Sequence, residues 1–95
     1  MRAHGLAVAA LLLALPAAAQ NAPLAAQGCV SCHGPGGTGA GGVPALAGRD
    51  RDELIALMVA FRANERPATI MGRISRGYSA EEVTASAEYF ARLGR

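Results

Sequence analysis

The chain contains two cysteines, and both lie in the pentapeptide Cys29-Val30-Ser31-Cys32-His33. The order C-x-x-C-H is the sequence of a c-type haem attachment site. Its two thiols add across the two vinyl groups of the porphyrin, and the adjacent histidine lies under the iron as proximal ligand. The motif therefore predicts one covalently attached haem c, bound by Cys29 and Cys32 and ligated by His33.

Three other uses of the cysteine pair fit the sequence less well. A zinc site needs four ligands, and half of one is present. A thioredoxin-like redox pair belongs near a βαβ pattern, which the sequence lacks. A single disulfide would be meagre support for so small a secreted domain.

The first residues have the pattern of a secretory signal. Arg2 supplies the charged start, an apolar run extends from Leu6 to Leu15, and Ala17-Ala18-Ala19 forms a small-residue cleavage site. The apolar run is shorter than the roughly 20 residues that span a bilayer, so a retained membrane anchor is the less favoured alternative. We expect residues 1–19 to be a cleaved signal peptide and residues 20–95 to be a single periplasmic domain with no membrane span.

Composition excludes some functions and makes a cofactor useful. The formal net charge is +2, and all nine basic residues are arginine. No polybasic run or nucleic-acid motif occurs, so we expect no nucleic-acid partner. A domain of this size buries only about 60% of its unfolded surface and needs additional support. A covalently bound haem would supply it.

The middle of the chain is rich in glycine. A short helical turn is expected between Pro23 and Gly28, and residues 34–48 form a loop. Gly37, Gly39 and Gly42 match the G-x-G-x-x-G phosphate-binding pattern. The match is misleading, because no strand precedes it and no helix begins at its end. The glycines more plausibly let the backbone run close to a flat ligand, although a flexible linker is the alternative.

Two longer helices are predicted from their caps and periodicity. Asp50 is a good N-cap with Glu53 three residues later, and apolar residues follow at helical spacing until the pattern fades near Asn64. Ser79 and Glu82 form a capping box before the last helix. No strand-like alternation competes, so the sequence predicts an all-α fold with three main helices around one haem.

The sixth position on the iron has few candidates. His4 lies in the expected signal, so the mature chain keeps His33 as its only histidine, and the chain has no lysine. Met58, Met71 or an open position remain. Met58 lies within an apolar stripe, where methionine usually fills a core. Met71 lies in a predicted loop that can present its thioether to the iron, so it is the favoured ligand.

These residues together resemble those of the class I cytochromes c. The resemblance rests on four stretches and covers Gly28 to Leu93: Cys29-Val30-Ser31-Cys32-His33-Gly34, Pro44-Ala45-Leu46-Ala47-Gly48, Met71, and Glu88-Tyr89-Phe90. It implies that the Pro44 carbonyl accepts the His33 Nδ1–H and that Leu46 packs on the haem. It also implies that the last helix crosses the first, although Leu24 is the one large apolar residue between the expected signal peptide and Cys29.

The segment that contains Met71, here called the methionine loop, resembles that of a narrower group of cytochromes. The run from Glu65 to Met71, followed by Gly72-Arg73-Ile74, is similar to that of the cytochrome subunit of flavocytochrome c sulfide dehydrogenases. That resemblance implies a monohaem subunit, not itself an enzyme, which takes electrons from a sulfide-oxidising flavoprotein and passes them to a downstream electron acceptor. A free soluble shuttle between a membrane complex and a terminal reductase or oxidase is the alternative. A haem enzyme or gas sensor would require an open iron.

The same stretch contains four arginines and only one glutamate. Arg62, Arg66, Arg73 and Arg76 could bind haem propionates, meet carboxylates of a partner, or remain solvated.

Overall fold

The computed structural model describes residues 22–93, so the expected signal peptide at residues 1–19 lies outside the described part. Within that part the chain is helical, and its only β-type pairing is an isolated bridge between Ala40 and Val43. The all-α prediction is confirmed. No helix among these residues is long and apolar enough to cross a membrane.

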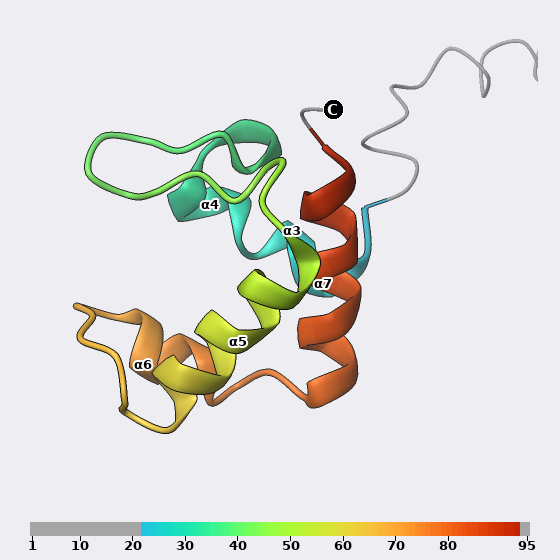
Figure 1. The fold of residues 1–95 in the computed structure, drawn as a ribbon. Helices are drawn as coiled ribbons and strands as arrows, with labels where there is room; N and C mark the ends of the chain where they lie inside the picture. The colour runs from blue at the N-terminus through green and yellow to red at the C-terminus, as the bar shows by residue number, and fades with distance from the viewer. Residues whose placement is uncertain (1–21, 94–95) are drawn as a thin grey trace, which may run out of the picture.

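Helices α5 and α7 form the frame of the molecule (Figure 1). Helix α5 covers Arg51–Arg62, and the Asp50 side chain caps it by accepting from the Glu53 backbone N–H at 3.0 Å. The Glu53 carboxylate binds Arg49 instead of returning to the cap residue, so the cap is not a reciprocal box.

Helix α7 covers Ala80–Arg92 and begins with the complete capping box expected from the sequence. The Glu82 backbone N–H donates to Ser79 Oγ at 3.1 Å, and the Ser79 N–H donates to the Glu82 carboxylate at 2.9 Å. Each such cap typically contributes about 1 kcal/mol.

Four shorter helices complete the part of the fold that residues 22–93 form. Helix α3 covers Leu24–Gln27, α4 covers Val30–His33, the 3₁₀ helix η1 covers Pro35–Gly37, and α6 covers Met71–Ser75. The first was predicted as a helical turn, whereas α6 falls where a loop was expected. Because α6 has five residues and no side-chain cap, neither periodicity nor a capping residue announces it.

The buried apolar core is small and lies where α3 and α5 meet α7. It contains Ala26, Leu54, Ala87, Tyr89 and Phe90. Ala26 is 1% exposed, whereas Leu24 is 83% exposed, so α3 crosses α7 through a methyl group and not through its large side chain. The crossing of the first and last helices is present, but it is slim.

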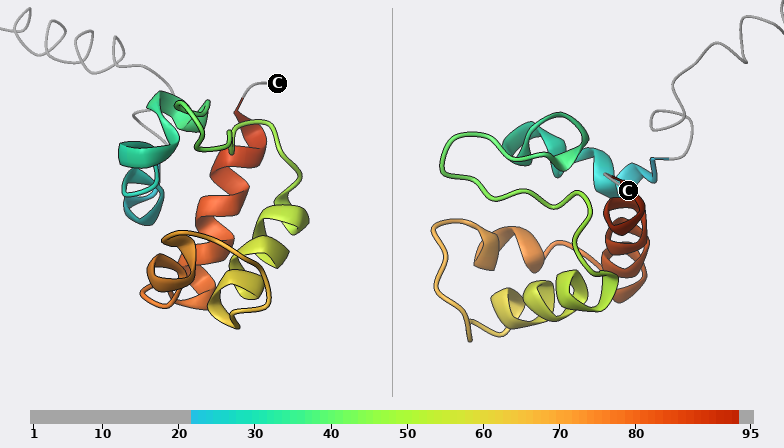
Figure 2. Two further views of the ribbon diagram at one scale, coloured as in Figure 1. Left: turned by 90° about the vertical axis from the view of Figure 1, so that its left-hand side faces the viewer. Right: turned by 45° about the horizontal axis from the view of Figure 1, so that its top comes forward.

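The glycine-rich loop is ordered by backbone hydrogen bonds. The Gly37 carbonyl accepts from the N–H groups of Leu46 and Ala47, and the Gly48 N–H donates to the Phe90 carbonyl of α7 at 2.9 Å. The flexible-linker alternative is therefore wrong. This loop and the loop between α5 and α6 project to the same side of the molecule, away from α7 (Figures 1 and 2).

Candidate functional site

The attachment motif itself is helical. Cys29 is the N-cap residue of α4, and the His33 N–H donates to the Cys29 carbonyl at 2.9 Å. Residues three apart on a helix share a face, so this turn presents both thiols to the same side. Cys29 is half-buried, Cys32 is exposed, and neither forms a disulfide. The pair is therefore free to bond to a ligand beside α4.

A hydrogen bond fixes the protonation of His33. Its Nδ1 lies 2.6 Å from the carbonyl oxygen of Pro44, and the residue is 8% exposed. Because a carbonyl only accepts, Nδ1 carries a proton, and in the neutral imidazole this tautomer leaves the lone pair that a metal needs on Nε2. The contact that the family resemblance implied is thus formed by the chain.

A largely apolar cavity of about 480 Å³ lies beside this histidine. Its size is typical of a cofactor pocket. All six residues predicted to bind the cofactor line it: Cys29, Cys32, His33, Pro44, Leu46 and Met71. Three core residues, Leu54, Ala87 and Phe90, also contribute to its walls.

The side chains at the cavity wall include the groups that a haem c needs for attachment and ligation. Two free thiols and an imidazole with an available Nε2 lie at the same wall, as thioether attachment and axial ligation require. Ser86 also lines the cavity, and its buried hydroxyl has no hydrogen-bond partner among the described residues, which is unusual for a buried polar group. A zinc site is not supported, because the described residues contain no cluster of three histidine, cysteine or carboxylate ligands.

Two methionines reach the cavity. Met71 is half-buried as the first residue of α6, and Met58 lies in the middle of α5. Both line the cavity. Met58, which was expected to fill a core, also lines the cavity, because α5 turns one part of its apolar stripe to the core and another part to the cavity. The assignment of Met71 as axial ligand stays a prediction.

Tyr78, which follows α6, contacts both α3 and the attachment motif. Its hydroxyl donates to the Ala25 carbonyl at 2.9 Å and lies 3.9 Å from Cys29 Sγ. Burial raises the pKa of the Cys29 thiol, and the hydrogen bond between that thiol and Tyr78 opposes the rise. Burial, together with Cys29 and Glu82, raises the pKa of Tyr78 to about 12. No local motif in the sequence signals the contact of Tyr78 with Ala25, because 53 positions separate the two residues.

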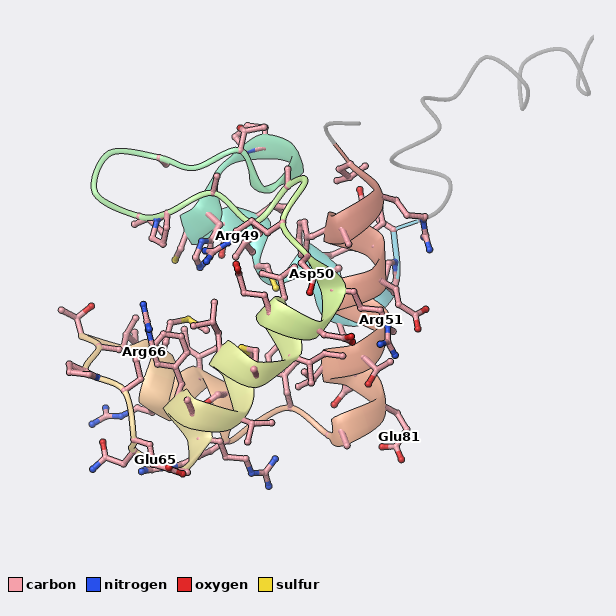
Figure 3. All side chains as sticks on the ribbon, viewed as in Figure 1. Arg49, Asp50, Arg51, Glu65, Arg66 and Glu81 are labelled. Atoms are coloured by element: carbon pink, nitrogen blue, oxygen red, sulfur yellow. The ribbon has the colours of Figure 1, made fainter. Side chains whose placement is uncertain are left out.

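The arginines of the methionine loop divide into different roles. Arg62 Nη1 donates to the Tyr78 carbonyl at 2.8 Å, and Arg73 and Arg76 are exposed outside the cavity lining. Arg66 lines the cavity, and so does Arg49, which sequence reasoning missed. These two come from the loop after α5 and the segment before it (Figure 3).

Comparison with known families gives one extensive match. The family model described as Cytochrome c matches residues 18–93. That range contains the attachment motif, the Pro44 segment and both cavity methionines.

Two similar proteins carry names that refer to a thiosulfate dehydrogenase and a sulfide dehydrogenase. The thiosulfate dehydrogenase electron acceptor of Stutzerimonas stutzeri (strain A1501) is 46% identical over 71 residues, which cover 70% of this chain and 33% of that protein. The cytochrome subunit of sulfide dehydrogenase from Chlorobaculum tepidum is 33% identical over 67 residues, which cover 70% of this chain and 61% of that protein. The chain thus spans less than two thirds of the length of either relative.

Solved structures agree with the fold. The structure of cytochrome c4 from Acidithiobacillus ferrooxidans matches with a TM-score of 0.66 and 32% identity, covering 68% of this chain and 38% of that one. The thiosulfate dehydrogenase of Marichromatium purpuratum matches with a TM-score of 0.70 and 36% identity, covering 82% of this chain and 20% of that one.

Proposed function

Because this chain belongs to the cytochrome c family, as a class I member with one covalently attached haem c, we propose that it transfers single electrons with its iron held between His33 and Met71. The bound haem supplies one-electron chemistry, with a potential set by its axial ligands and surroundings. The residues of the chain set the axial ligands, the access of solvent and the contact with partners.

The observation that carries this proposal is the hydrogen bond from His33 Nδ1 to the Pro44 carbonyl at 2.6 Å. It orients the imidazole and increases the basicity of Nε2. A preorganised ligand of this kind suits electron transfer, because little needs to move when the charge on the iron changes.

Met71 is the better placed of the two methionines for the opposite side. It begins α6 directly after an exposed loop, Glu65 to Ile70, which can move to bring the thioether to the iron. Met58 is held within a twelve-residue helix. Thioether ligation by Met71 would close the iron to small molecules and raise its potential, which argues against a gas sensor or a haem enzyme.

The favoured electron donor is a sulfide-oxidising flavoprotein, with this chain as its cytochrome subunit in the periplasm. The methionine-loop resemblance and the relative from Chlorobaculum tepidum support this donor. The apolar side chains of Val43, Ile70 and Ile74 at the cavity also suit a lasting contact, and Ile70 is 53% exposed.

A second candidate donor is a thiosulfate dehydrogenase. It is favoured by the 46% identity with the electron acceptor of such an enzyme. Both donors would leave this chain in the same chemical role, namely accepting single electrons and passing them to a downstream acceptor.

Isolation of the haem-loaded protein from its own periplasm, followed by absorption spectroscopy, separates these candidates. We expect a flavin to co-purify and sulfide to reduce first the flavin and then the haem. Reduction by thiosulfate without a flavin would instead establish the second donor. A lone cytochrome that neither reagent reduces, even with periplasmic extract, would contradict both and leave a free shuttle.

A further inference from the structure

Two arginines line the cavity among the described residues, and they differ in how their charge is compensated. Arg49 donates from Nε and Nη2 to the same carboxylate oxygen of Glu53, at 2.7 and 2.6 Å. Arg66 forms no ion pair with any described carboxylate. One positive charge at the cavity wall is therefore neutralised within the protein, whereas the other is not.

The guanidinium of Arg66, an exposed residue, lies over an aromatic ring. Its central carbon lies 5.8 Å from the centroid of Phe61, a residue that also lines the cavity. Such a cation–π contact restricts the side chain but uses none of its five N–H donors in hydrogen bonds to oxygen. Arg66 extends from its loop toward the side on which Arg49 lies (Figure 3).

An uncompensated, restricted guanidinium at an apolar wall is suited to bind a carboxylate that enters with the ligand. The haem is a largely apolar macrocycle with two propionate carboxylates at one edge. Of the other arginines near the methionine, Arg62 is committed to the Tyr78 carbonyl, and Arg73 and Arg76 do not line the cavity. The observations therefore single out one residue.

We propose that Arg66 binds a propionate carboxylate of the haem through paired N–H donors. Planar guanidinium groups match carboxylates in this way, and the pair is stronger where solvent is partly excluded. Arg66 touches no iron ligand and acts through the propionate, so it is a positioning residue. Its positive charge disfavours the oxidised iron and thereby raises the reduction potential. The proposal depends on the haem and is independent of which enzyme donates the electrons.

The test compares two charge-removing variants of the haem-loaded protein. Arg66→Gln removes the cation at the cavity wall. Arg73→Gln removes an equal charge from an exposed position of α6 that does not line the cavity. Resonance Raman spectroscopy reports the propionate bending band, and a redox titration at fixed pH reports the potential. Arg66→Lys keeps the charge but loses the paired geometry.

We expect Arg66→Gln to shift the propionate band and lower the potential, while Arg73→Gln leaves the band unchanged. Arg66→Lys should restore most of the potential but not the band. An unshifted band in Arg66→Gln would overturn the proposal. Slower electron transfer from the partner in both glutamine variants, with the band unchanged, would also overturn it and make Arg66 part of a docking surface. The propionate band and the potential are both measured without any donor.

Discussion

His33 Nδ1 and the carbonyl oxygen of Pro44 lie 2.6 Å apart, which joins the end of α4 to the far side of the glycine-rich loop. The acceptor is a backbone atom, so its position depends on the conformation at residue 44. A proline there fixes φ near −65° and limits the freedom of that carbonyl.

Pro44→Gly should therefore weaken the hydrogen bond without removing its acceptor. We expect a higher reduction potential, because a less polarised imidazole donates less charge to the oxidised iron. We also expect a loss of about 1 kcal/mol in the free energy of unfolding. Redox titration and denaturant unfolding measure the two effects. Pro35→Gly is the control, since the Pro35 carbonyl accepts from Thr38 and does not contact His33.

Gly37 and Gly36 provide a matched pair for the packing of the loop on α7. Both have positive φ, +71° and +63°, but a Cβ on Gly37 would lie 2.6 Å from a Phe90 ring carbon, whereas one on Gly36 meets nothing within 4 Å. Gly36→Ala should cost about 1–2 kcal/mol for the left-handed backbone. Gly37→Ala should cost a further ~1–3 kcal/mol for overpacking. Equal losses on denaturant unfolding would show that Phe90 moves aside freely.

Met71→Ala and Met58→Ala test the axial ligand. Loss of Met71 should lower the potential and allow carbon monoxide to bind the reduced protein, because Met58 is held within α5 and should not take its place. Loss of Met58 should leave the iron closed and cost about 2 kcal/mol of stability through lost packing. Carbon monoxide difference spectra distinguish the two variants. An open iron in Met58→Ala alone would exchange the roles of the two methionines.

Tyr78 predicts a dependence of stability on alkaline pH. Burial is the main cause that raises its pKa from 10 to about 12. The contributions of the Cys29 thiol end when that thiol becomes a thioether, whereas burial still raises the pKa of Tyr78. The folded state therefore retains the Tyr78 proton more strongly than the unfolded state. Its contribution is present below pH 10 and is lost as the pH rises through about 12.

The Tyr78→Phe variant removes both this pH dependence and the hydrogen bond to the Ala25 carbonyl. Below pH 10 we expect it to be less stable than the wild type by about 1 kcal/mol. Between pH 10 and pH 12 the two stability curves should converge. Parallel curves in denaturant unfolding across this range would mean that the phenol titrates normally.

The double variant Cys29→Ala, Cys32→Ala tests whether the polypeptide folds without its cofactor. Five apolar residues are buried beside a cavity of about 480 Å³, and three of the five line that cavity. We expect the variant to be largely unfolded, since so small a core does not offset the entropy of ordering the chain. A cooperative thermal transition with native-like helical circular dichroism would refute this expectation.

The sequence was most informative where a side chain caps a helix or joins a short motif. Asp50 and Ser79 predicted where α5 and α7 begin, because their hydrogen bonds involve residues three positions away. The attachment motif predicted the cofactor because its chemistry depends on local spacing. The six candidate site residues, which span Cys29 to Met71, all reached one cavity.

What could not be predicted depends on contacts between distant segments. Met58 belongs to an apolar stripe that serves both the core and the cavity, and periodicity does not divide the two. Arg49 becomes a cavity residue only because the loop before α5 folds back toward α4. Tyr78 meets Ala25 across 53 positions of sequence, and no local pattern encodes that contact.

Three residues, Leu54, Ala87 and Phe90, belong both to the core and to the cavity wall. This affects how long a copy of the protein should survive in the cell. A chain released without its cofactor would expose the same side chains that proteases recognise in unfolded polypeptides. Attachment at Cys29 and Cys32 would thus decide which copies persist. Cellular abundance of this cytochrome would then follow the supply of haem more closely than the rate of translation.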